Sequence, residues 1–242
     1  MKTAQETLEA ARRRLIVALD VADGEAALAA ASRLVGHVGM IKVGLELFVA
    51  EGPDVVRRLR TALPGLEVFL DLKLHDIPNT MRGAIRSART LGVRFITVHA
   101  GSGVAHLRAC VEEAGDTLGV LAVTVLTSQD EAACAEAGHT RGPAELVAIR
   151  AAVARAAGCA GLVCSGQELA SVRTIAGDLA CVVPGIRPAG GELGDQKRVM
   201  TPHAAILAGA GYLVVGRPIL GAEDPVAAAD AIVAEMSAAL GE

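Results

Sequence analysis

Apolar, β-branched runs alternate with alanine-rich segments of helical period along almost the whole chain. The apolar runs are continuous, which is typical of strands buried on both faces of a parallel sheet. Several of the alanine-rich segments open with proline in their first turn, where the missing N–H costs nothing. The predicted strands span 15–20, 40–45, 68–73, 95–100, 120–127, 161–165, 181–186 and 213–217, and the predicted helices span 25–34, 53–61, 78–91, 104–114, 143–157, 167–175, 202–208 and 225–240.

Eight strand–helix pairs within 242 residues predict an α/β fold, a closed (β/α)8 or TIM barrel that forms a single domain over residues 1–242. An open, doubly wound sheet is the alternative arrangement of the same elements. The segment 188–197 is rich in glycine and charge, and we expect a functional, mobile loop there of the kind that often forms a lid.

Composition excludes several classes of protein. Hydrophobic residues make up 52% of the chain, which excludes global disorder. The net charge of -4 and the aromatic content of 2% provide neither a basic surface nor a stacking platform for nucleic acid. We expect no export signal, because the N-terminal residues lack an apolar stretch. No uncharged apolar run reaches the ~18 residues of a membrane span, and the five cysteines lack metal-site spacing. We expect a cytoplasmic protein with buried thiols.

Polar side chains recur where the predicted strands end. The carboxyl ends of barrel strands form one mouth, which is where barrel enzymes place their active sites. Each residue taken alone fits a purely structural role. Asp20 could cap a helix, Lys42 could be a surface lysine and His99 could be a core histidine. Their convergence on one mouth favours a functional site. The residues are Asp20, Lys42, Asp71, Lys73, His99, Thr127, Ser128, Arg187 and Arg217.

The segment 71–80, DLKLHDIPNT, turns ionic inside an apolar strand. Alternate residues of a strand face the same way, so Asp71 and Lys73 share one face. Burying unpaired charges is costly, so these two must pair or do chemistry. An ammonium held protonated by Asp71 and Asp76 would be a proton donor, and a structural ion pair at the strand end is the alternative.

The segment 209–218, GAGYLVVGRP, has the features of a phosphate site. Barrel phosphate sites are built after the seventh and eighth strands, from backbone N–H groups and a helix N-terminus. Gly216 permits close backbone approach and Arg217 can hold a phosphate through two parallel hydrogen bonds. Simple glycine-rich packing is the alternative.

No metal or cofactor site is expected. The six histidines lack the HxxxH spacing and the carboxylate clusters of metal sites. His75, Asp76 and His99 could still meet around a metal in space, which is the alternative.

The segment 71–80 resembles the signature of the orotidine 5'-phosphate decarboxylase family, which catalyses the last step of UMP synthesis. The Asp-x-Lys-x-x-Asp spacing is shared with related sugar-phosphate enzymes, whereas the Ile-Pro-Asn-Thr that follows makes the likeness specific. At 101–104 the chain reads GSGV where the family pattern has a Gly-Gly pair. Further matching blocks lie at 19–20, 41–44, 98–100, 125–128, 163–165, 184–187, 195–198 and 215–218.

The resemblance implies a carboxy-lyase that expels the carboxylate of orotidine 5'-phosphate as CO2, without a cofactor, and protonates the C6 carbanion from Lys73. Asp71 would sit against the departing carboxylate, while Lys42 and Asp20 would contact the ribose and complete a charge network. The protein would be a homodimer with shared active sites, into which Asp76 and Thr80 reach from the partner subunit. The residues implied in binding base and phosphate are Thr127, Ser128, Arg187, Gln196, Gly216 and Arg217.

Two other functions fit parts of the pattern. A hexulose-phosphate synthase or related sugar-phosphate lyase shares the barrel and the acidic-lysine spacing but uses a magnesium ion, and Ile-Pro-Asn-Thr disfavours it. A non-catalytic barrel that binds phosphoribosyl ligands is the other. The Asp71–Lys73 pair argues against it, because a protein that only binds need not keep a desolvated charge array.

Overall fold

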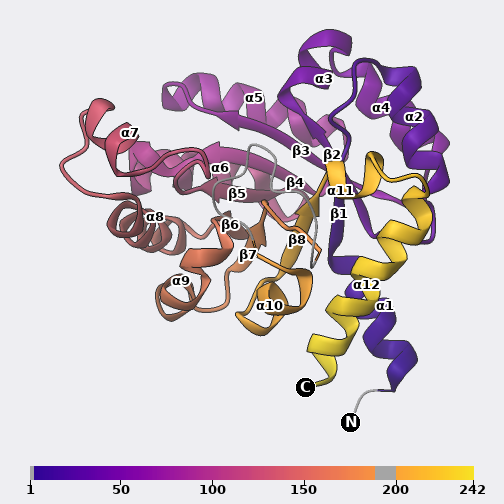
Figure 1. Cartoon of the computed structure of the whole chain (residues 1–242). Coiled ribbons are helices and arrows are strands. Elements are labelled where there is room, and N and C mark those ends of the chain that lie inside the picture. The colour runs from indigo at the N-terminus through magenta and orange to yellow at the C-terminus, as the bar shows by residue number, and fades with distance from the viewer. Residues whose placement is uncertain (1–2, 189–199) are drawn as a thin grey trace.

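The computed structural model describes residues 3–188 and 200–242. Eight parallel strands close into a barrel in chain order, with β8 paired to β1 (Figure 1). The predicted TIM barrel is confirmed, and the open sheet is excluded because β1 and β8 are not edge strands. The strands are β1 (Leu15–Ala18), β2 (Met40–Gly44), β3 (Glu67–Leu74), β4 (Phe95–His99), β5 (Gly119–Val123), β6 (Gly161–Val163), β7 (Ala180–Val183) and β8 (Tyr212–Val215).

Helices cover the outside of the barrel (Figure 1). Each predicted helix is present, within a few residues of its expected bounds. They are α2 (Gly24–Arg33), α4 (Asp54–Ala62), α5 (Pro78–Thr90), α6 (Val104–Ala114), α8 (Pro143–Ala157), α9 (Leu169–Ala176), α10 (Pro202–Leu207) and α12 (Pro225–Gly241).

Four more α-helices occur within residues 3–188 and 200–242. The first, α1 (Ala4–Arg14), begins at a capping box in which Thr3 Oγ1 accepts a hydrogen bond from the Glu6 amide, and it packs alongside α12. Three short helices are absent from the sequence prediction: α3 (Leu45–Glu51), α7 (Glu131–Glu136) and α11 (Arg217–Leu220). The first and last of these begin directly where β2 and β8 end, so they lie at the mouth of the barrel.

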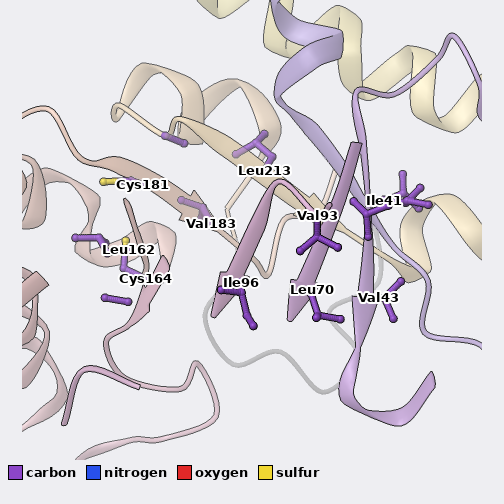
Figure 2. Packing of buried hydrophobic residues seen from close by; sticks show 14 of the residues in the cluster. Ile41, Val43, Leu70, Val93, Ile96, Leu162, Cys164, Cys181, Val183 and Leu213 are labelled. Atoms are coloured by element: carbon purple, nitrogen blue, oxygen red, sulfur yellow. The ribbon is translucent and has the colours of Figure 1, made fainter. Parts of the chain in front are cut away.

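The hydrophobic core has two layers because barrel strands present alternate side chains to the interior and to the helices. The outer layer lies between strands and helices, and Figure 2 shows part of it, including Ile41, Leu70 and Ile96. The five cysteines are all buried and none forms a disulfide, as predicted. The inner layer consists of Ile16, Ala18, Met40, Phe69, Phe95, Leu121, Val182 and Val214.

All eight strand ends differ from the prediction, by one to four residues, and the fifth differs most. The fifth strand was predicted to reach Thr127 because the apolar run continues, but β5 ends at Val123. Thr124 still donates its amide to the Val163 carbonyl at 3.2 Å, after which the chain turns so that the Gln129 amide donates to the Leu126 carbonyl at 2.9 Å. The eighth strand ends at Val215, two residues before its predicted end.

In the part of the chain that is described, no helix is both long and apolar enough to cross a membrane. Of the loop predicted over 188–197, only Pro188 lies within the described residues.

Candidate active site

The site is built one step above the inner hydrophobic layer. Side chains two residues apart on a strand face the same side, so the residues two positions after the inner-layer residues also point into the barrel, at its carboxyl end. The positions that follow Ala18, Met40, Phe69, Phe95 and Val214 in this way carry polar or small residues. They are Asp20, Lys42, Asp71, Thr97 and Gly216.

Four charged side chains form one connected array. Lys42 Nζ donates to Asp20 Oδ1 at 3.1 Å and lies 3.7 Å from Asp71 Oδ2, and Lys73 Nζ donates to the same Asp71 oxygen at 2.8 Å. The central Lys42 and Asp71 side chains are only 10% and 12% exposed, whereas the terminal Asp20 and Lys73 are 60% and 38% exposed. The array is electrically balanced, with two cations and two anions. Its buried centre is fixed by pairing, while both ends are accessible from the mouth.

Lys73 occupies an unusual backbone conformation. Its φ of 49° is the only positive φ of a non-glycine residue within 3–188 and 200–242. The register between β3 and β4 shifts there: Leu70 pairs with Ile96, but the next pair is Leu74 with Val98. A left-handed conformation costs an ordinary residue about 1–2 kcal/mol, so surrounding contacts must impose it.

Thr97 provides such contacts, and the sequence analysis missed it. Its Oγ1 accepts from the Lys73 amide at 2.8 Å and donates to Asp71 Oδ1 at 2.9 Å. The available signal was a hydroxyl at a buried position of a predicted strand, because buried hydroxyls need hydrogen-bond partners.

The rest of the signature segment turns outward. Asp76 is exposed and its Oδ1 accepts from the Ile77 amide at 2.6 Å, while Ile77 is 66% exposed and Thr80 lies exposed in the first turn of α5. Among the ion pairs between described residues, none joins Asp76 to Lys73. Within one chain the structure therefore brings Asp20, Lys42, Asp71 and Lys73 together, but not Asp76 or Thr80.

Two histidines flank the array. The His75 and His99 rings lie 5.5 Å apart, and His75 Nε2 is 2.8 Å from Ser102 Oγ. Burial lowers the pKa of His99, and the nearby charges of His75, Arg150 and Lys73 lower it further. Ser102 lies in the segment 101–104, where the chain departs from the Gly-Gly pair of the family pattern, and it provides a hydrogen-bond partner for His75. No group of three side chains suited to a metal occurs in the described segments.

Two arginines lie close together after β7 and β8. Arg187 follows β7, donates Nη1 to the Ile186 carbonyl at 2.8 Å, and has its own amide bonded to the Met200 carbonyl at 3.0 Å. Burial lowers the pKa of the Arg187 guanidinium, and the positive charge of Arg217 lowers it further. A Cβ on Gly216 would lie 3.5 Å from Asp20 Oδ2, so this backbone runs directly beside the charge array.

Of the residues implied in base contact, Thr127 and Ser128 lie in the turn after β5 rather than at the end of the strand itself. Thr127 is half-buried and Ser128 is exposed. Gln196 lies outside the described residues.

Comparison with known proteins identifies the family of the chain. The model of the Orotidine 5'-phosphate decarboxylase / HUMPS family matches residues 13–232. The chain belongs to this family. Within it, the chain is 52% identical over 232 residues to an orotidine 5'-phosphate decarboxylase of Rhodopseudomonas palustris, covering 95% of this chain and 96% of the relative.

Other members of the family are similar over the same extent. The orotidine 5'-phosphate decarboxylase of Methylobacterium radiotolerans is 53% identical over 227 residues, covering 93% of this chain and 97% of the relative. The crystal structure of the enzyme from Lactobacillus acidophilus superimposes with a TM-score of 0.81 at 38% identity, covering 93% of this chain and 99% of that one.

Proposed function

We propose that this chain decarboxylates orotidine 5'-phosphate to UMP through a C6 carbanion that Lys73 protonates, without a cofactor. The carboxy-lyase activity itself, a step of pyrimidine synthesis, follows from membership of the family and from identity of about half of all residues to curated decarboxylases. The observation that carries the finer proposal is the pairing of Lys73 with the buried Asp71 at 2.8 Å, with the lysine side chain 38% exposed at the mouth.

The charge balance of the array suits this reaction. Without substrate, Asp20 and Asp71 offset Lys42 and Lys73. When the C6–carboxylate bond breaks, its electron pair stays on C6 and CO2 leaves as a neutral molecule. Negative charge thus moves from the carboxylate, which would lie beside Asp71, to a carbon that would lie beside the Lys73 ammonium. Preorganised charges of this kind stabilise a transition state without reorganising during the reaction.

Lys73 then transfers a proton to C6, which gives UMP and a neutral amine. Solvent at the mouth returns the proton after the product leaves.

The remaining roles extend from the array. We propose that Asp20 and Lys42 contact the ribose, that Thr127 or Ser128 contacts the base, and that Gln196 closes over base and phosphate from the 188–197 loop. Arg187, Arg217 and the Gly216 backbone would hold the phosphate. The proximity of the two guanidiniums supports this, because two neighbouring guanidiniums can both donate hydrogen bonds to one phosphate.

We further propose a homodimer in which Asp76 and Thr80 enter the partner's site. The outward course of the segment supports it: Asp76, Ile77 and Thr80 are exposed although they belong to the signature segment that begins at the buried Asp71.

Purified protein should consume orotidine 5'-phosphate, measured as loss of the orotate ultraviolet absorbance together with CO2 release, in the presence of EDTA. Lys73→Ala should abolish turnover while circular dichroism shows an intact fold. Lys73→Arg should also be inactive, because a guanidinium keeps the charge beside Asp71 but does not release its proton.

The outcomes separate the rival functions. Turnover of a hexulose phosphate that EDTA abolishes would indicate the magnesium-dependent lyases of the family. Tight UMP binding without turnover of orotidine 5'-phosphate would indicate a binding protein. Near-normal activity of Lys73→Ala would remove Lys73 from its proposed role.

A further inference from the structure

Thr97 lies at the centre of β4 and is fully buried, with 0% exposure. An amide N–H can only donate, so the Thr97 oxygen accepts from the Lys73 amide and its single proton goes to the Asp71 carboxylate. The polarity of both bonds is therefore determined.

The hydroxyl acts where the sheet is out of register. Between the pairs Leu70–Ile96 and Leu74–Val98, three residues of β3 lie opposite the single residue Thr97. The Lys73 amide bonds to the side chain of Thr97 at this irregularity. The Thr97 side chain thus binds the irregular part of β3 to β4, at Lys73, the residue with the left-handed backbone.

The left-handed conformation of Lys73 costs energy, because the side chain crowds the backbone there. The hydrogen bond from the Lys73 amide to Thr97 Oγ1 favours this conformation, and the bond from Thr97 to the Asp71 carboxylate holds the hydroxyl in place.

The hydrogen bond from Thr97 to Asp71 gives the two carboxylate oxygens different partners. Thr97 occupies Oδ1, which leaves Oδ2 for Lys73 at 2.8 Å and Lys42 at 3.7 Å. A partial rotation of the carboxylate would move Oδ2 away from both lysines.

We propose that Thr97 is a positioning residue for the decarboxylation. It holds Lys73 in the backbone conformation that aims its ammonium at the reacting carbon, and it holds Asp71 so that one oxygen faces both lysines. The inference rests on the proposed function of Lys73. The part that concerns the Lys73 backbone and the Asp71 carboxylate can be tested without measuring turnover.

The test compares Thr97→Val, which keeps the shape and removes the hydroxyl, with Thr97→Ser, which keeps the hydroxyl. Thr124→Val is the matched control, because Thr124 is equally buried and its hydroxyl donates to the Val163 carbonyl at 2.7 Å, outside the array. Thr97→Val should lower kcat by about tenfold or more, with KM and the Kd for UMP within about threefold of wild type. Thr97→Ser should restore kcat, and Thr124→Val should retain it.

Crystal structures of the same variants provide the second readout. In Thr97→Val, the φ of Lys73 should leave the positive region and the Asp71 carboxylate should rotate, whereas Thr97→Ser should keep both. Unchanged geometry at Lys73 and Asp71 in Thr97→Val would overturn the inference. This result does not depend on activity, whereas an inactive wild type would contradict only the proposed function. Three kinetic results would also overturn the inference. They are a normal kcat in Thr97→Val, a kcat in Thr97→Ser as low as in Thr97→Val, and a loss of kcat in the control Thr124→Val as large as in Thr97→Val.

Discussion

A Cβ atom on Gly44 would lie 2.9 Å from the Nζ of Lys42. The same atom would lie 3.3 Å from Asp20 Oδ1, and Gly44 stands opposite Asp71 in the register of β2 and β3. The absence of a side chain at this position thus provides the space in which Lys42 links the two carboxylates.

Gly44→Ala should therefore damage the site more than the fold. The added methyl displaces the flexible end of Lys42, so thermal stability should stay near wild type, while kcat/KM should fall by about tenfold or more, which is about 1.4 kcal/mol of transition-state stabilisation. Steady-state kinetics and a thermal melt measure both. Gly65→Ala is the control, since a Cβ there meets open space. Unchanged kcat/KM in Gly44→Ala would contradict the importance of the Lys42 position.

Arg217→Ala should weaken binding of the phosphate group of orotidine 5'-phosphate. Hydrogen bonds to charged groups contribute about 1.5–3 kcal/mol, so kcat/KM for orotidine 5'-phosphate should fall about 10- to 150-fold. Orotidine, which lacks the phosphate, should be converted equally slowly by variant and wild type. Arg94→Ala, at the opposite end of the barrel, is the charge-matched control. An equal loss on both substrates would show that Arg217 acts elsewhere than on the phosphate.

Mixing two inactive variants should restore activity if the sites are shared. In a heterodimer of Lys73→Ala and Asp76→Asn, one site lacks both groups and the other has Lys73 from one subunit and Asp76 from its partner. Random reassembly of equal amounts should give about one quarter of wild-type activity. Each variant reassembled alone is the control. Mass spectrometry that shows heterodimers without regained activity would place Asp76 in its own subunit's site.

Acid should destabilise the fold through its buried histidines. Burial is the main cause that lowers the pKa of both His99 and His106, with the charge of His75 adding to it. The unfolded chain, with histidine pKa values near 6.5, then binds more protons than the folded chain just below that pH. The contribution of these histidines to the free energy of unfolding should have its full value above about pH 6.5. It should decrease as the pH falls toward the lowered pKa values.

Denaturant unfolding at several pH values between 7.5 and 5.5 measures this decrease. In His106→Leu the decrease should be smaller, because a buried imidazole whose Nε2 has no hydrogen-bond partner among the described residues is removed. His203→Gln, at the surface beside Glu242, is the control for loss of a histidine. An unchanged pH dependence in His106→Leu would exclude His106 as a contributor.

The barrel was predictable because its signal is local and repeated. Continuous apolar runs and proline at helix starts marked the strands and helices, and the bounds of α6 and α8 agree with the prediction to the residue. Strand parity also placed Asp71 and Lys73 on one face, and the ion pair between them has that geometry. The end of β5 was mispredicted because an apolar run does not reveal where its hydrogen-bond partner strand stops.

By itself, the sequence determined the eightfold alternation, the mouth at which the charged residues gather, and the family to which the chain belongs. Only the tertiary structure decided that β3 shifts register against β4, that Lys73 adopts a positive φ, and that Thr97 and Gly44 shape the array. These features depend on contacts between residues of neighbouring strands that are distant in sequence. Hydrogen bonds and steric room of that kind form only after the strands have paired, so no local pattern of residues encodes them.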